Sequence, residues 1–204
     1  MESLGVPQRR KRHFLISSRA DAVDAAEVVH AIEESLQPAR TVRWAIADLH
    51  GSSAKLGSSG FDAPSVMSEE NKRRIALLFK KGLYRLPDEE RPVCHRDGQH
   101  SYRSVYGRMR WDEPAQTITT GYSSMGQGCF VHPAARRTIT PHEAARLQTF
   151  PDFFRFDTVI HSRTAWARSI GNAVPPLAMR AICRDVVRQV SQARARRSKV
   201  LSDS

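Results

Sequence analysis

Apolar residues recur at helical spacing along four stretches of the chain, and each stretch predicts a helix with one buried face. The four stretches cover residues 20–37, 68–82, 140–150 and 179–190. Three of them end at a residue that stops a helix, because Pro38 and Pro151 follow two of them and Gly82 lies at the end of another. The pattern therefore predicts where these helices end as well as which face they bury.

Two of the predicted helices also begin at residues that cap helices. Thr140 is followed by Pro141 and Glu143, which makes a Thr-x-x-Glu capping box with proline at the first helical position. Ser68 precedes two glutamates that complement the positive end of the helix dipole. Side-chain chemistry therefore specifies both helix starts, in addition to the apolar spacing.

Other stretches carry weaker patterns. Residues 41–48 alternate in a way that suits a short strand or a short helix, and the sequence leaves both open. Short strands are predicted for residues 13–16 and at the end of the run 101–120, whereas glycine and serine in residues 49–66 predict a loop. An aromatic cluster is assigned to core packing and consists of Phe153, Phe154 and Phe156.

Composition adds a strong positive charge to this picture. The 204 residues include 32 Lys and Arg against 21 Asp and Glu, which gives a formal net charge of +11. Solubility alone does not require so large an excess. The charge indicates a polyanionic partner, and nucleic acid fits best because arginines also lie inside the predicted structured segments.

Cysteine usage and hydropathy bear on the compartment. Three cysteines lie far apart and are odd in number, so no disulfide framework is indicated and a reducing compartment is expected. No stretch approaches the roughly 18 apolar residues of a membrane-spanning helix, and no signal peptide is recognisable. We therefore expect a cytoplasmic protein without a membrane partner.

Cysteine and histidine side chains also raise the question of zinc. The residue types that bind zinc occur at Cys94, His95, His100, Cys129 and His132. Their spacing does not fit the usual pattern, in which two close ligands are followed by two more at a defined gap. We predict no metal site.

The segment from Arg137 to Asp152 carries a longer signal, Thr-x-Thr-Pro-x-Glu-x-Ala-Arg-Leu-Gln-x-Phe-Pro-Asp. This run resembles the ninth sequence motif of DNA cytosine-5 methyltransferases, which organises the target-recognition domain in that family. The resemblance implies that double-stranded DNA is the partner and that cytosine is the target base.

A second match lies near the N-terminus, where Gly-Val-Pro-Gln-x-Arg-x-Arg runs from Gly5 to Arg12. It resembles the eighth motif of the same family, with Gln8, Arg10 and Arg12 at the three characteristic positions. By resemblance, all three are DNA-binding residues. Arg12 would donate to the O2 atom of a flipped cytosine, and Arg10 would hold a phosphate or support the site. A guanidinium suits both roles because it stays charged and offers planar donors.

Thr117 and Ile118 match a Thr-apolar dipeptide that grips the DNA backbone beside the flipped base in bacterial members of the family. Thr119, Thr120 and Gly121 follow directly and are predicted to contact DNA as well. A plain half-buried strand is the alternative interpretation of the dipeptide.

The third match is the run Ile-Gly-Asn-Ala-Val-Pro-Pro from Ile170 to Pro176. It resembles the tenth motif, which returns to the catalytic domain and borders the S-adenosylmethionine pocket. Asn172, Ala173 and Val174 are therefore the predicted cofactor-binding residues. Some members have serine where Ala173 stands, so only a backbone contact is possible there.

Other parts of the family pattern are missing from this sequence. It has no Gly-rich cofactor loop, no Pro-Cys nucleophile and no Glu-Asn-Val segment, and its cysteines follow Val93, Gly128 and Ile182. We therefore expect the C-terminal part of a split enzyme. An N-terminal half with motifs one to six would supply the nucleophile and share S-adenosylmethionine with this chain. A truncated inactive remnant and a non-catalytic DNA-binding or regulatory module are the alternatives.

The resemblance also implies a fold class. We expect an α/β fragment of an AdoMet-dependent methyltransferase catalytic domain plus an irregular, β-containing target-recognition domain. The expected parts are the end of the catalytic domain at 1–19, the recognition domain at 20–164, the return to the catalytic domain at 165–192, and a frayed basic tail at 193–204. The enzyme would be bacterial and associate with the nucleoid, and the resemblance is to enzymes of the kind found in restriction-modification systems, although the sequence leaves open whether this chain belongs to one.

Overall fold

A computed structural model of the chain describes residues 1–17, 22–50, 60–96, 105–159 and 161–202. In chain order its strands and α-helices are β1 (Gln8–Arg9), α1 (Ala25–Glu34), α2 (Val42–Ile46), α3 (Glu69–Lys80), β2 (Ala115–Gln116), α4 (Pro141–Leu147), α5 (Phe156–Val159), α6 (Arg163–Asn172) and α7 (Pro176–Ser202). Short 3₁₀ turns cover Ala47–Leu49, Asp88–Glu90, Val93–His95 and Met125–Gln127.

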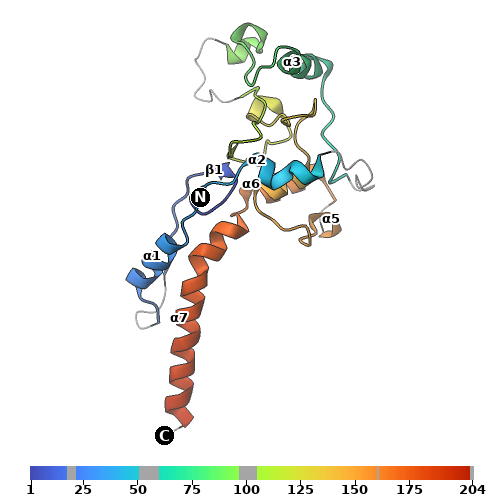
Figure 1. Cartoon of the computed structure of the whole chain (residues 1–204). Helices are drawn as coiled ribbons and strands as arrows, with labels where there is room; N and C mark the ends of the chain where they lie inside the picture. The colour runs from blue at the N-terminus through green and yellow to red at the C-terminus, as the bar shows by residue number, and fades with distance from the viewer. Residues whose placement is uncertain (18–21, 51–59, 97–104, 160, 203–204) are drawn as a thin grey trace.

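These elements form an elongated molecule in three parts (Figure 1). The central body holds β1, β2, α2, α4, α5 and α6; a lobe built on α3 lies at one end, and a stalk formed by α1 against α7 leaves at the other. Each part has its own apolar cluster, represented by Phe130, Leu147 and Ile170 in the body, by Ile75, Leu78 and Leu86 in the lobe, and by Leu4, Val6 and Ile182 in the stalk. The body cluster is the largest, so the body is the part that can fix side chains most rigidly.

The sheet joins two remote segments. β1 pairs in parallel with β2, with Gln8 opposite Ala115 and Arg9 opposite Gln116. A strand predicted at 13–16 is wrong, because no strand is assigned there and the side chain of Leu15 is 96% exposed. A strand needs a neighbour for its backbone N–H and C=O groups, and the described residues place none beside this stretch.

The capped helices are confirmed. Thr140 and Glu143 form the reciprocal capping box of α4, and the Ser68 hydroxyl accepts the third N–H of α3. Residues 41–48, which the sequence left open, form a helix because the Thr41 side chain caps α2. The first predicted helix is shorter than expected, since Asp24 caps α1 and the helix ends before Ser35.

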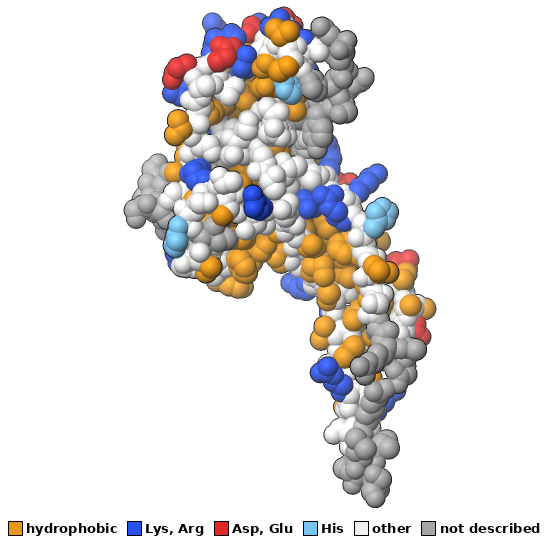
Figure 2. Space-filling model, turned by 180° about the vertical axis from the view of Figure 1, so that it is seen from behind, with side chains coloured by type: hydrophobic (Ala, Val, Ile, Leu, Met, Phe, Trp, Pro, Cys, Tyr) orange, Lys and Arg blue, Asp and Glu red, His pale blue; other side chains and the backbone are white. Residues whose placement is uncertain are grey.

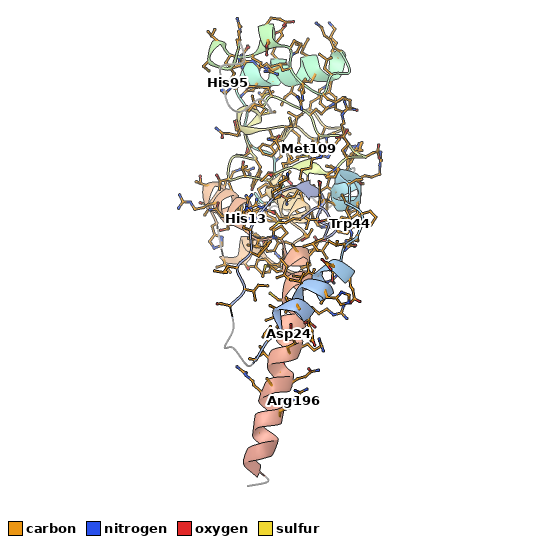
Figure 3. All side chains as sticks on the ribbon, turned by 90° about the vertical axis from the view of Figure 1, so that its left-hand side faces the viewer. His13, Asp24, Trp44, His95, Met109 and Arg196 are labelled. Carbon is orange, nitrogen blue, oxygen red and sulfur yellow. The ribbon has the colours of Figure 1, made fainter. Side chains whose placement is uncertain are left out.

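Two other expectations need correction. The predicted frayed tail is helical, because α7 continues to Ser202 through residues with good helix propensity and without glycine or proline after Pro176. Arg196 lies on the part of α7 that extends past α1 (Figure 3).

In the aromatic cluster Phe156 is buried as predicted, but Phe153 is 85% exposed and Phe154 is 51% exposed. None of the described helices is both long and apolar enough to cross a bilayer.

A buried polar pair stabilises the turn before α4. His132 Nδ1 accepts hydrogen bonds from the backbone N–H groups of Ala134 and Ala135 at 3.0 and 2.9 Å, so that nitrogen carries no proton. The opposite nitrogen, Nε2, faces a Glu143 oxygen at 3.6 Å. Glu143 also accepts two hydrogen bonds of 2.7 Å from Arg137, which leaves the histidine neutral beside a paired carboxylate. Burial is the main reason that the pKa of His132 is lowered to about 4.

This lowered pKa predicts a pH dependence of stability. Between pH 6.5 and about 4 the unfolded chain binds a proton on this histidine that the folded chain does not, so the free energy of unfolding should fall as the pH falls. The loss should approach about 3 kcal/mol at the acid end of that window and be absent above pH 6.5. Urea unfolding at a series of pH values should show a shallower fall for His132→Asn, because asparagine does not titrate. His30→Asn on the exposed side of α1 is the matched control, and it should follow the unchanged chain. Equal pH profiles for all three proteins would contradict the assignment.

Candidate functional site

Segments more than 100 residues apart meet at the β1–β2 pair. Three segments that hold predicted site residues lie together there, next to the end of α4. They are segments 8–12, 117–121 and 170–174. Two buried polar side chains of the first segment make the connections, Gln8 at 0% exposure and Arg10 at 6%. We refer to their hydrogen bonds as the Gln8–Arg10 network.

Gln8 uses both ends of its amide inside the protein. Its Nε2 donates to the Leu147 carbonyl at 3.1 Å and to Gln148 Oε1 at 2.7 Å, both at the end of α4. Its Oε1 accepts the N–H of Ile118 at 3.1 Å. In this arrangement the Gln8 side chain has no surface open to DNA, so its contribution is to join α4 to the predicted DNA-contacting segment.

Arg10 extends the network to the end of α6. Its guanidinium donates to the carbonyl of Ile118 at 3.0 Å and to those of Gly171 and Ala173 at 3.4 Å. Burial, and to a smaller degree the charge of Arg12, lowers the pKa of the Arg10 side chain. These bonds fit the predicted supporting role of Arg10, because the donors they use are not available to a phosphate.

Gly171 is required where α6 approaches this segment. A Cβ atom at this position would lie 2.4 Å from the Thr120 nitrogen and 2.5 Å from the Thr119 carbonyl carbon, and both of these are backbone atoms. Gln148 adds a second link, because its Nε2 donates to the Ile170 carbonyl at 2.6 Å. Close packing and hydrogen bonds therefore hold the third segment against the second.

The remaining predicted residues lie at or near the surface around this network. Arg12 is exposed, and its Nη1 donates to the Lys11 carbonyl at 2.6 Å. Thr117 Oγ1 donates to the Arg9 carbonyl at 2.6 Å, and Thr119 Oγ1 accepts the Gly121 N–H at 3.3 Å. Thr120, Asn172 and Val174 are exposed, Gly121 and Ala173 are half-buried, and the Ile118 side chain is fully buried. The network thus leaves Arg12, Thr120 and Asn172 free to face a ligand.

Most of the zinc-type residues of the sequence and the basic side chains of α3 can be located in the structure. Among the described residues no three His, Cys, Asp or Glu side chains gather as a metal-binding set, and His100 lies outside the described residues. Basic side chains of α3 form ion pairs within the chain, since Lys72 pairs with Glu69 and Arg73 pairs with Glu70 and Glu90. A solvated face therefore accounts for much of the charge on that helix.

Sequence reasoning missed Gln148 as a site residue. It is fully buried and connects Gln8 to α6, yet in the sequence it is simply the residue that follows α4. A glutamine at the end of an otherwise apolar helix face was the available signal, because a buried amide must find hydrogen-bond partners. Its partners could not be read from the local pattern.

Replacing Gln8 with methionine should test the network. Methionine has a similar length but leaves the Ile118 N–H and Gln148 Oε1 without the hydrogen bonds that Gln8 makes to them, so we expect the free energy of unfolding to fall by about 2–3 kcal/mol. Chemical unfolding followed by tryptophan fluorescence measures this change. Gln192→Met on the exposed surface of α7 is the matched control and should change stability by less than about 0.5 kcal/mol. A Gln8 variant as stable as that control would show that the network contributes little.

The chain is similar to known DNA methylases. The family model for C-5 cytosine-specific DNA methylases matches residues 1–188. Type II methyltransferase M1.BsuMI of Bacillus subtilis is 48% identical over 85% of this chain and 39% of its own length. Type II methylase M.HgiDII of Herpetosiphon aurantiacus is 36% identical over 90% of this chain and 52% of its own length. DNA (cytosine-5)-methyltransferase 1 of the mouse is 40% identical over 45% of this chain and 6% of its own length.

The matches to M1.BsuMI and M.HgiDII cover most of this chain but only part of each relative. The chain spans about two fifths of M1.BsuMI and about half of M.HgiDII. The family model, in contrast, covers nearly the whole of this chain, including all three segments that the Gln8–Arg10 network joins. The chain belongs to the C-5 cytosine-specific DNA methylase family.

Proposed function

We propose that this chain presents duplex DNA in a cytosine-5 methyltransferase whose nucleophile and cofactor loop belong to another polypeptide. The observation that carries the proposal is the convergence of three segments on the Gln8–Arg10 network, which leaves Arg12 exposed beside them. The missing Pro-Cys nucleophile supports the second polypeptide, because none of the three cysteines follows a proline.

The proposed chemistry assigns Arg12 to the target base. An enzyme that acts on C5 of a paired cytosine must first take the base out of the stack. A thiolate of the other polypeptide would form a bond to C6, and negative charge would then develop over the ring O2 and N3. The Arg12 guanidinium would donate to O2 and stabilise that charge. After methylation a base would take the C5 proton and the thiolate would leave C6, which restores the aromatic ring.

S-adenosylmethionine, when bound, supplies the methyl group. The residues at the end of α6 fit one edge of a site for it, because the Asn172 amide is exposed and the Val174 side chain is 44% exposed. The Ala173 carbonyl is already engaged by Arg10, so this residue would contribute only its remaining backbone atoms. The chain would therefore border the cofactor, and the other polypeptide would hold most of it.

Exposed apolar side chains support the proposal that another polypeptide docks on this chain. Figure 2 shows hydrophobic side chains gathered on the reverse face where α7 leaves the body. Large apolar residues that are more than a third exposed include Phe14, Leu15, Ile16, Val174 and Val187. Apolar surface of this kind typically marks an interface, and an interface here would also give residues 13–16 the strand neighbour that they lack.

Complementation tests the function directly. The chain would be mixed with a polypeptide that carries the missing motifs, such as the part of M1.BsuMI outside the matched region, and methyl transfer from labelled S-adenosylmethionine to duplex DNA would be measured. We expect incorporation only when both polypeptides are present. Incorporation by this chain alone would contradict the proposal. Duplex binding without incorporation in any mixture would favour the non-catalytic DNA-binding module.

Arg12→Ala should separate binding from turnover in the complemented enzyme. We expect duplex affinity to change little and turnover to fall about tenfold or more, because the lost donor acts on charge that develops during the reaction. Lys11→Ala removes the same charge from the adjacent exposed position and is the matched control, for which turnover should stay unchanged. Equal turnover of the two variants would remove Arg12 from the proposed site.

A further inference from the structure

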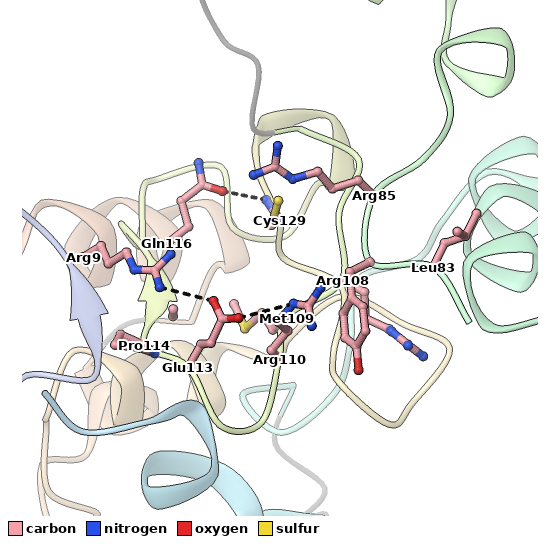
Figure 4. Close-up of a pocket in the computed structure, with 12 residues that line it drawn as sticks. Arg9, Leu83, Arg85, Arg108, Met109, Arg110, Glu113, Pro114, Gln116 and Cys129 are labelled. Carbon is pink, nitrogen blue, oxygen red and sulfur yellow. Dashed lines mark hydrogen bonds and ion pairs between the residues drawn. The ribbon is translucent and has the colours of Figure 1, made fainter. Parts of the chain in front are cut away.

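A concave cleft lies between the β1–β2 pair of the body and the base of the α3 lobe (Figure 4). Its volume is about 670 Å³, and its charged and polar lining consists of Arg9, Tyr84, Arg85, Arg108, Arg110, Glu113, Gln116 and Cys129. Arg9 and Gln116 enter from the sheet and Arg85 enters from the lobe side, whereas Arg108 and Arg110 flank Met109 of the body cluster. We call this feature the arginine cleft.

The charge of the arginine cleft is strongly positive. Among the described residues, four guanidinium groups line it against one carboxylate, that of Glu113. Glu113 lies between two of them, with Arg9 Nη2 at 3.2 Å and Arg110 Nε at 3.4 Å. One carboxylate cannot neutralise four arginines, so the cleft attracts a ligand that carries more than one negative charge.

Aromatic rings hold two of the arginines in place. The Arg110 guanidinium lies 3.8 Å from the centre of the Tyr84 ring, and that of Arg108 lies 4.4 Å from the same ring and 4.5 Å from the Phe79 ring. Stacking restricts the rotamers of a long side chain, so little further ordering is needed when a ligand binds. Arg108 Nε is also buried, and no hydrogen-bond partner for it lies within the described part of the chain.

The cleft is continuous with the predicted DNA-contacting segment. Gln116 lines the cleft and directly precedes Thr117, whose hydroxyl donates to the Arg9 carbonyl at 2.6 Å. The Gln116 side chain is itself fixed, because its Oε1 accepts the Cys129 N–H at 2.9 Å. A DNA strand that runs past Thr117 therefore has the arginine cleft next along its path.

We propose that the arginine cleft binds the sugar-phosphate backbone of duplex DNA beside the target base, with Arg9, Arg85 and Arg110 as its phosphate contacts. This inference rests on the proposed function, because it takes the DNA to lie along segment 117–121. In the free protein Glu113 occupies Arg9 and Arg110, and phosphate oxygens would replace the carboxylate as their acceptors. Phosphate contacts of this kind position a duplex and carry no sequence information.

The test is the salt dependence of duplex binding by the full chain. Binding of a fluorescent 24-base-pair duplex would be measured by anisotropy at several sodium chloride concentrations, for two unrelated DNA sequences. Each lost phosphate contact should reduce the slope of log K against log salt by about 0.9. The double variant Arg85→Gln/Arg110→Gln should therefore lose about two units of slope on both sequences. Arg180→Gln, an exposed site on α7, is the control and should keep the slope.

A variant that is expected to keep or strengthen DNA binding distinguishes loss of a phosphate contact from misfolding. Glu113→Gln removes the competing carboxylate, so it should bind both duplexes at least as tightly as the unchanged chain. An unchanged slope for the double variant, a loss confined to one DNA sequence, or weaker binding by Glu113→Gln would each overturn the phosphate assignment alone. Failure of the unchanged chain to bind either duplex at low salt would overturn the proposed function together with it.

Discussion

The body of this protein depends on two polar side chains that are buried and must be satisfied. An amide or a guanidinium removed from water costs more free energy than a typical hydrogen bond contributes, so each must find several partners. Gln8 and Arg10 find theirs on segments that are far apart in the chain: the end of α4, both backbone groups of Ile118, and the end of α6. The two-residue pairing of β1 with β2 alone is too short to hold these segments together. The hydrogen bonds of Gln8 and Arg10 therefore hold these segments together, as the backbone hydrogen bonds of a larger sheet do in other proteins.

This arrangement divides the predicted site residues into two groups. Gln8, Arg10 and Gly171 face inward and position the backbone of their neighbours, whereas Arg12, Thr120 and Asn172 remain exposed. Burial along segment 8–12 follows this division, because Gln8 and Arg10 are buried and make the network, whereas Arg12 at the end of the segment is exposed. A rigid base for an exposed arginine is what charge stabilisation at a developing anion requires. The proposed function thus rests on these few contacts, whereas the family membership rests on the match over residues 1–188.

The capping contacts within a helical turn could be predicted from the sequence, whereas contacts between residues far apart in the chain could not. Thr140 and Ser68 specified the starts of α4 and α3, because a cap and its partner lie within one helical turn. The partners of Gln8 could not be predicted, since any buried carbonyl or N–H group satisfies an amide and the partner nearest in the sequence, Ile118, lies 110 residues away. The three motifs named the segments that meet without showing that Arg10 faces inward. Residues 13–16 and Phe153 were misassigned for a shared reason, because apolar character predicts burial only when the chain supplies a surface to cover it.

The claim that the Gln8–Arg10 network assembles the site within this chain is tested most directly by hydrogen exchange at one amide. The Ile118 N–H donates to the buried Gln8 side chain and belongs to the segment between the other two. In the purified chain, without any added polypeptide or DNA, its exchange should be slowed about a hundredfold or more relative to an unstructured peptide. Exchange at the unstructured rate would show that the three segments do not come together in this chain alone, and would contradict the account.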